Sequence, residues 1–183
     1  MGNEVLGFGI DESNHGRYPE FFVAVSSQVH SDFVEVPELL PKIRKKASQD
    51  FTNTLFSRFH CRKYSYLTVS KEDFSRWHKY EQKGIIISSL LYPLPKISVL
   101  ELYLDGELRS DILKNTRSLV SDFLNIRGKC TINIFTGKDL DRRVSIVNLA
   151  DQLAHYFYKV YNKCRNLDSL SARYGEHEKD LLK

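Results

Sequence analysis

The amino-acid sequence lacks the features that mark membrane-spanning and secreted proteins. It contains no run of about 18 apolar residues, which is the length that an α-helix needs to cross a bilayer. No basic stretch followed by an apolar segment stands at the start of the sequence, so no secretory signal peptide is expected. We therefore expect a cytoplasmic protein that does not enter a membrane.

Cysteine is scarce and poorly spaced for cross-linking. The three cysteines, Cys61, Cys130 and Cys164, lie far apart and form no C-x-x-C pair. An odd number at this spacing argues against both a disulfide framework and a zinc site. Repeats, low-complexity segments and Ser/Gly-rich linkers are also lacking. We expect the cysteines to be ordinary buried or half-buried thiols.

The length and composition fit one domain with one insertion. The chain has 183 residues, of which 42% are hydrophobic, and this is enough for a substantial core. We expect the domain to cover residues 1–168, with a helical insertion at about residues 37–62. Residues 169–183 are highly charged and are expected to form a weakly anchored tail. No pattern predicts the oligomeric state.

Hydrophobic periodicity predicts a hairpin and a third strand, followed by alternating helices and strands. The predicted strands cover residues 4–10, 21–27, 63–69, 97–104 and 131–135, and the predicted helices cover residues 70–91, 110–124 and 144–161. Ser70 and Asp73 predict a helix start, and Gly84 predicts a break between two helices. Because a hairpin is antiparallel whereas helical crossovers connect parallel strands, we expect an α/β fold. Its mixed five-stranded sheet should have helices on both faces and the helical insertion after the second strand.

Acidic residues stand at the ends of two predicted strands. A strand over residues 7–10 stops at Asp11 and Glu12, and the strand over residues 97–104 stops at Asp105. Each acid has an alternative role as a turn residue, because Asp before Gly or Ser often closes a strand by bonding to its own backbone. The helical character of the residues after Asp105 argues against a hairpin turn at that position.

A third acid, Asp151, interrupts the apolar helix predicted over residues 144–161, where an unpaired charge is costly to desolvate. At helical spacing, Asn148, Asp151 and His155 form one polar stripe beside the core face. The stripe is either a solvated helix face or a carboxylate directed at the two strand ends. In the second case, the acids would suit Mg²⁺ or Mn²⁺, which prefer hard oxygen ligands.

Two short segments carry a resemblance to a known superfamily. Gly9-Ile10-Asp11-Glu12-Ser13 resembles the Asp-Glu-Ala-Gly opening of type 2 ribonuclease H. It is closer to a family of uncharacterised microbial proteins that begin with Asp-Glu-Ser-Gly and end with a Gln-Leu-Ala-Asp helix, which corresponds here to Asn148-Leu149-Ala150-Asp151. The order of strands and acids is similar to that of the ribonuclease H-like superfamily, and the resemblance spans most of the chain.

The resemblance implies that Asp11, Glu12, Asp105 and Asp151 are catalytic residues that hold two divalent metal ions, Mg²⁺ or Mn²⁺. Two metals bridged by carboxylates supply the activated water and the charge stabilisation that phosphodiester hydrolysis needs. We therefore expect a metal-dependent nuclease or related phosphodiester-processing hydrolase that acts on nucleic acid. The Gly-Arg-Gly with which type 2 enzymes sense RNA is absent, so the substrate stays unassigned.

Two other functions remain open. The first is a nucleic-acid- or protein-binding module that keeps the same fold without turnover, because a fold does not fix a function. The second is a phosphoaspartate phosphatase with Asp11 as the nucleophile. That function predicts another Asp two residues later, and Ser13 occupies the position.

Other polar residues are candidates for the surroundings of the cation or the substrate. These are Ser13, Lys138, Asn148 and His155. His155 is one helical turn from Asp151 and is either a proton shuttle or a surface histidine. Asp139 and Asp141 are alternative acids, and they rank below Asp151 because a polar loop with turn or cap residues is expected there.

Basic residues are candidates for contacts with a nucleic-acid backbone. The net charge of +4 permits such a partner without demanding one. The candidates lie within and directly after the predicted insertion: Lys42, Lys45, Lys46, Arg58, Arg62 and Lys63. The alternative is a solvated helix face followed by an edge strand that lysine and arginine protect. Arg142 and Arg143 lie unfavourably for the dipole of the last helix, which suggests a ligand.

Overall fold

The computed structural model describes residues 5–13, 16, 18–27, 64–91, 99–125 and 130–164. The predicted insertion at residues 37–62 and the predicted tail at residues 169–183 lie outside these residues. The elements along the chain are β1 (Val5–Ser13), β2 (Glu20–Ser27), β3 (Tyr64–Val69), α2 (Lys71–Arg76), α3 (Gln82–Leu90), β4 (Val99–Asp105), α4 (Ser110–Asn125), β5 (Thr131–Gly137), the short 3₁₀ helix η2 (Leu140–Arg142) and α5 (Ser145–Cys164).

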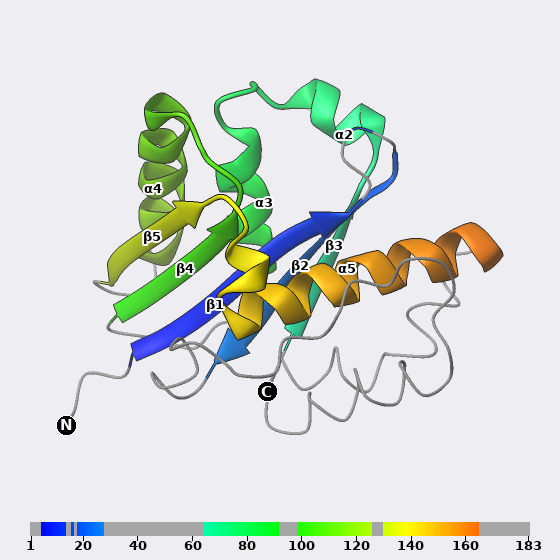
Figure 1. Cartoon of the computed structure of the whole chain (residues 1–183). Coiled ribbons are helices and arrows are strands. Elements are labelled where there is room, and N and C mark those ends of the chain that lie inside the picture. Colours follow the sequence, from blue (N-terminus) through cyan, green and yellow to red (C-terminus); the bar gives the residue numbers. More distant parts are fainter. Residues whose placement is uncertain are drawn as a thin grey trace.

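The five strands form one mixed sheet in the order β3-β2-β1-β4-β5 (Figure 1). β1 pairs antiparallel with β2, and β2 pairs antiparallel with β3. β4 pairs parallel with both β1 and β5. The opening hairpin and the parallel second half are therefore confirmed. β1 lies at the centre, with its end next to the end of β4.

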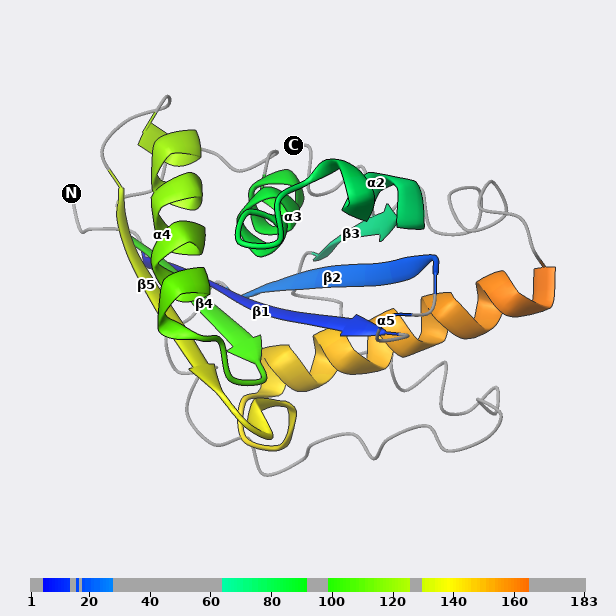
Figure 2. The ribbon, with the colours of Figure 1, turned by 90° about the horizontal axis from the view of Figure 1, so that it is seen from above.

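Each face of the sheet carries its own apolar core, because alternate residues of a strand point to opposite faces. On one face, Phe8, Leu102 and Ile134 pack with residues of α3 and α4. On the other face, Phe21 and Val23 pack with residues of α5. Figure 2 shows α5 on one side of the sheet and α3 on the other. Helices cover both faces, as the alternation of elements predicts. No helix among the described residues is long and apolar enough to span a membrane.

The start of α2 is a capping box, as Ser70 and Asp73 predict. The Ser70 hydroxyl accepts the N–H of Asp73 at 3.1 Å, and the Asp73 carboxylate accepts the N–H of Ser70 at 3.0 Å. These two bonds satisfy donors that a helix end would otherwise leave without a partner. The cap orients α2 so that Phe74 and Trp77 pack on the core between the sheet and α3.

Two predicted boundaries are wrong. β1 does not stop before Asp11 but continues through Ser13, because β2 pairs with it along that whole length. The helical region does not break at Gly84, which lies inside α3, but between α2 and α3. Gly84 is needed for packing: a Cβ there would lie 2.7 Å from Leu119 Cδ1 on α4. The glycine therefore lets α3 and α4 approach closely.

Candidate metal-binding site

Asp11 and Asp105 lie side by side at the ends of the two central parallel strands. The register pairs Ile10 of β1 with Leu104 of β4, so the next residue of each strand faces the same side of the sheet. That side is the one that α5 covers. Asp11 is buried and Asp105 is partly exposed. The pairing of the strands thus brings together two carboxylates that are 94 positions apart in the sequence.

Asp151 reaches the same place from α5. Burial raises the pKa of Asp11 to about 8, and the negative charges of Asp151, Glu12 and Asp105 add to the effect in that order. Like charges disfavour ionisation only over short distances, so this shift shows that the other three acids are close to Asp11. The charges of these acids thus act on Asp11, and their role as ligands of a cation stays a prediction.

Asp105 also connects the sheet to the turn before α5. Its Oδ1 accepts the N–H of Leu140 at 2.6 Å and lies 3.4 Å from the N–H of Asp141, in the first turn of η2. Asp141 itself is 2% exposed. The expectation that Asp141 lies in a polar loop is therefore wrong, because η2 folds back against the end of β4 and buries it. Asp139, with φ of 59°, forms the turn before η2.

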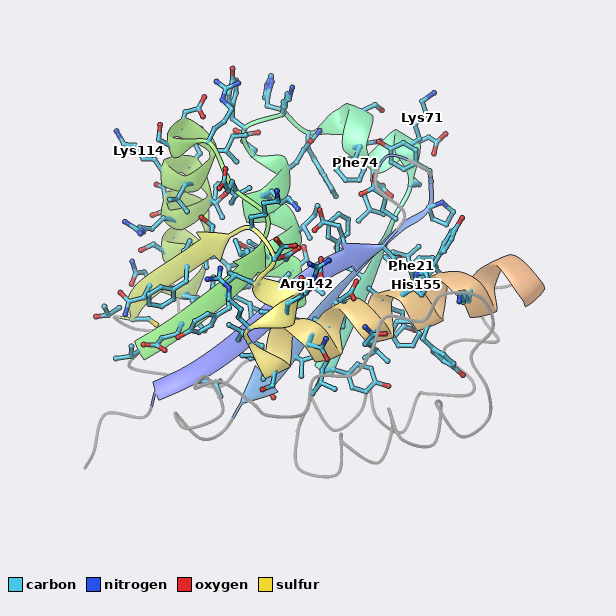
Figure 3. The ribbon with its side chains drawn as sticks, viewed as in Figure 1. Phe21, Lys71, Phe74, Lys114, Arg142 and His155 are labelled. Carbon is cyan, nitrogen blue, oxygen red and sulfur yellow. The ribbon has the colours of Figure 1, made fainter. Side chains whose placement is uncertain are left out.

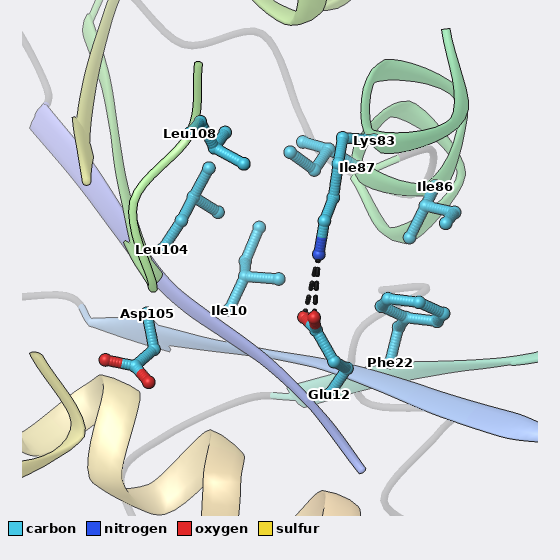
Figure 4. A pocket seen from close by; sticks show the side chains of 9 residues that line it. All are labelled: Ile10, Glu12, Phe22, Lys83, Ile86, Ile87, Leu104, Asp105 and Leu108. Atoms are coloured by element: carbon cyan, nitrogen blue, oxygen red, sulfur yellow. Dashed lines mark hydrogen bonds and ion pairs between the residues drawn. The ribbon is translucent and has the colours of Figure 1, made fainter. Parts of the chain in front are cut away.

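Glu12 points to the opposite face of the sheet from Asp11. Both of its carboxylate oxygens lie 2.9 Å from Lys83 Nζ on α3. The Lys83 ammonium also lies 5.3 Å from the centre of the Phe22 ring. In Figure 4, Glu12 and Lys83 point toward one another across a pocket, whereas the Asp105 carboxylate points away from them. Of the four predicted acids, three are thus on the α5 face and Glu12 is on the α3 face.

The other candidates of the site lie along the α5 face and the turn before α5. Ser13 is buried on the same face as Asp11, and its Oγ has no hydrogen-bond partner among the described residues. Asn148 is buried on α5, and His155 is half-buried one turn beyond Asp151. Lys138 is exposed in the turn after β5. Their proposed roles beside a cation or substrate stay predictions.

The two arginines before α5 make local contacts. Arg142 Nη1 lies 3.7 Å from the carboxylate of Asp139, and Arg143 Nη2 donates to the carbonyl of Lys138 at 3.1 Å. Both side chains are exposed, and Figure 3 shows Arg142 on η2 and His155 farther along α5. These contacts stabilise the turn that connects β5 to α5. The six basic candidates Lys42, Lys45, Lys46, Arg58, Arg62 and Lys63 lie outside the described residues.

Solved structures with the same arrangement of elements are ribonucleases. RNase HII in its complex with PCNA from Archaeoglobus fulgidus superposes with a TM-score of 0.60 at 15% identity, over 93% of this chain and 78% of that one. Ribonuclease H2 from Pyrococcus horikoshii OT3 gives 0.52 at 17% identity, with coverages of 93% and 78%. A mutant form of Bst-RNase HIII gives 0.53 at 15% identity, with coverages of 96% and 56%. The chain has the ribonuclease H-like fold.

The ribonuclease H-like fold is thus confirmed by structure and not by sequence. Family models give no match to the chain, and a search of curated protein sequences gives none. At 15–17% identity, the likeness concerns the path of the backbone. The chemistry of the site therefore has to be argued from the residues of this chain.

The ribonuclease H-like fold implies divalent cations, and the donor chemistry of this site fits them. Asp11, Asp105 and Asp151 offer hard oxygen ligands on one face, and a cation would neutralise the charges that raise the pKa of Asp11. However, no group of three or more His, Cys, Asp or Glu side chains among the described residues is arranged to hold a metal ion. Asp105 and Glu12 are engaged by Leu140 and Lys83 instead. The types of donor suit a divalent cation, whereas the arrangement of the described side chains does not hold one.

Lys83 is the residue of this region that sequence reasoning does not single out, and Asp141 is one that it ranks low. Lys83 directly precedes the apolar run from Gly84 to Ile87, and a single lysine at the edge of a buried helix face is a recognisable feature. Its partner is 71 positions away, so only the tertiary structure identifies the pair. Asp141 ranks below Asp151 on sequence grounds, because nothing in the local sequence predicts its burial.

Proposed function

We propose that the protein is a divalent-metal-dependent nuclease, or a related phosphodiester-processing hydrolase, that acts on nucleic acid in the cytoplasm. Asp11, Asp105 and Asp151 would hold the cation, Mg²⁺ or Mn²⁺, with Glu12 on the opposite face as the fourth acid. When bound, the cation would supply a more acidic water and stabilise charge on the leaving oxygen. Nucleic acid is the proposed substrate because the similar structures are ribonucleases.

One observation carries this proposal. Burial raises the pKa of Asp11 on β1 to about 8, and the negative charges of Asp151 on α5 and Asp105 on β4 add to the effect, which supports a joint role for the three aspartates. Such a group of like charges weakens the folded protein by itself, because burial and repulsion both disfavour the ionised carboxylate. Perturbed acids of this kind are typical of functional sites.

The residues around the three aspartates have proposed roles other than binding the cation. The N–H of Leu140 fixes one oxygen of Asp105, which leaves the second oxygen for a ligand. Asn148 and Ser13 are buried polar groups of the same region that would orient the substrate or the aspartates. Exposed Lys138 would attract the phosphate backbone, as would the basic residues of the predicted insertion. His155 would accept or donate a proton one helical turn from Asp151.

The test is a pair of variants with a matched control. In Asp105→Asn and Asp151→Asn the carboxylate charge is lost while the size of the side chain is kept. We expect both to abolish the rise in Tm that Mn²⁺ gives the wild type by mass action, and to slow cleavage of DNA, RNA and hybrid substrates by at least about 100-fold. Asp122→Asn removes an exposed carboxylate of α4 and should change neither measurement. If both site variants bind Mn²⁺ and cleave like the wild type, the proposal is wrong.

The competing function is a binding module without turnover. The observation that favours it is that no described group of acids is arranged to hold a metal ion in this conformation. Binding and cleavage of the same substrates distinguish the nuclease from the binding module. A protein that retains each labelled substrate in a gel shift, leaves it intact with Mg²⁺ or Mn²⁺, and shows no change in Tm with Mn²⁺ is a binding module.

A further inference from the structure

The Glu12–Lys83 pair is a well-defined, partly buried ion pair and not a chance approach of two surface charges. Nζ of Lys83 lies 2.9 Å from both oxygens of Glu12, and it also lies above the Phe22 ring. Only 31% of the Lys83 side chain and 22% of the Glu12 side chain are exposed. Apolar side chains line the pocket around them: Ile10, Ile86, Ile87, Leu104 and Leu108. In such surroundings each charge depends on its partner, because water solvates neither of them fully.

The register of the sheet fixes the side on which this contact forms. Glu12 of β1 is the cross-strand partner of Phe22 of β2, and Phe22 belongs to the core below α3. Asp11, one residue earlier, therefore points to the α5 face. Glu12 is still close enough for its charge to affect Asp11. It is thus near the three aspartates but bound to a cation of the protein itself.

We propose that Lys83 is a positioning residue: the register places Glu12 on the α3 face, beyond the last residue pair of β1 and β4, and Lys83 keeps its carboxylate from turning past the end of β4 toward the aspartates. The three aspartates then take one divalent cation, and Glu12 is not among its ligands. This inference rests on the proposed function, because it assumes that the aspartates bind a cation. It assigns to this chain one cation where the resemblance implies two. Glu12 joins the ligands only when its bond to Lys83 is broken.

The proposal predicts how metal binding depends on the two residues. The measurement is titration calorimetry with Mn²⁺ on the full chain at pH 8, together with Tm in EDTA to verify folding. The wild type should bind one Mn²⁺. Glu12→Gln should keep this affinity within about twofold, because Glu12 is not a ligand. Lys83→Met keeps the apolar stem of the side chain and should tighten binding on the order of tenfold, because the freed carboxylate reaches the cation.

Three further variants separate positioning from a general effect of charge. Lys83→Arg keeps a cation beside Glu12 and should bind Mn²⁺ like the wild type. Lys79→Met removes an exposed positive charge near the start of α3 and should leave the affinity unchanged. In the double variant Lys83→Met with Glu12→Gln, the gain should vanish, because the carboxylate that would reach the cation is gone.

The outcomes that overturn the inference are distinct from those that overturn the proposed function. If Glu12→Gln weakens Mn²⁺ binding as much as Asp151→Asn, Glu12 is already a ligand and Lys83 does not hold it away. If the double variant binds Mn²⁺ as tightly as Lys83→Met alone, the gain in affinity comes only from the loss of a positive charge. Neither result contradicts the proposal that the protein is a nuclease. A wild type that binds no Mn²⁺ overturns both.

Discussion

The two faces of the sheet use the end of the same strand in different ways. On the α5 face, Asp11 meets Asp105 and Asp151, and like charges are collected in a buried place. On the α3 face, Glu12 meets Lys83, and opposite charges neutralise one another among apolar side chains. Repulsion between like charges costs stability in the first arrangement, whereas the second brings opposite charges of the chain together. A cation on the α5 face, as proposed above, would relieve this repulsion.

The close contacts that glycine allows differ between the two faces as well. α5 packs directly on β1 at Gly9, where a Cβ would overlap the backbone of Ile146 and Val147. α3 contacts its neighbour α4 at Gly84, where a Cβ would lie 2.7 Å from Leu119 Cδ1 and 2.9 Å from Leu119 Cβ. A contact between two backbones cannot adjust, whereas a contact with a side chain can. The α5 face therefore holds its aspartates in more rigid surroundings.

The largest expected effect tests this difference in rigidity. Gly9→Ala should lower the free energy of unfolding by about 3 kcal/mol, because the added methyl group forces α5 away from the sheet. Gly84→Ala should lower it by less, about 1 to 2 kcal/mol, since the end of the Leu119 side chain can move although its Cβ cannot, and alanine favours the helix. Urea unfolding of both variants measures the two values. Equal losses would show that the two faces are equally rigid.

An intermediate effect tests the charge repulsion on the α5 face. The folded-state pKa of Asp11, about 8, is above its ordinary value of 3.8, so the unfolded chain loses this proton first as the pH rises. The contribution of Asp11 to stability is therefore lost progressively between about pH 4 and pH 8 and is constant above that range. Asp11→Asn removes the ionisable group and with it this loss of stability at high pH. The variant should be more stable than the wild type on the order of 2 kcal/mol at pH 9, with little difference at pH 4.

The measurement is Tm at pH 4, 7 and 9 in EDTA. Asp122→Asn, on the exposed side of α4, is the control and should show no such dependence on pH. A gain from Asp11→Asn that is the same at all three pH values would contradict the raised pKa. It would also remove the main electrostatic difference between the two faces.

The smallest expected effect concerns the support of the α3 face. Ser70→Ala removes the side-chain acceptor of the cap that orients α2, and it should cost about 1 kcal/mol. Ser75→Ala, at an exposed hydroxyl of the same helix, should cost only a few tenths of that amount. Urea unfolding compares the two variants. A cost for Ser70→Ala as small as that for Ser75→Ala would show that the cap does not stabilise this layer.

Much of the fold was predictable because its determinants are local. The capping box at Ser70, the amphipathic pattern of α4 and the alternation in β3 are encoded in short segments. The errors arise where tertiary contacts override a local preference. Gly84 is a usual helix breaker but lies inside α3, because α4 packs against it. Asp141 looks like a loop residue, but η2 buries it.

The sequence by itself determined which acids are available. That Asp11 and Glu12 face opposite sides was decided by the pairing with β2, which continues β1 through Ser13, because side chains alternate along a strand. Only the tertiary structure decided which side is which. The pairing of Glu12 with Phe22 and the approach of α3 assign Glu12 to Lys83, and the packing of α5 assigns Asp11 to Asp105 and Asp151. The physical reason is that the alternation of side chains depends only on neighbouring residues of a strand. The face to which each side chain points depends on the elements packed there, which are dozens of positions away in the chain.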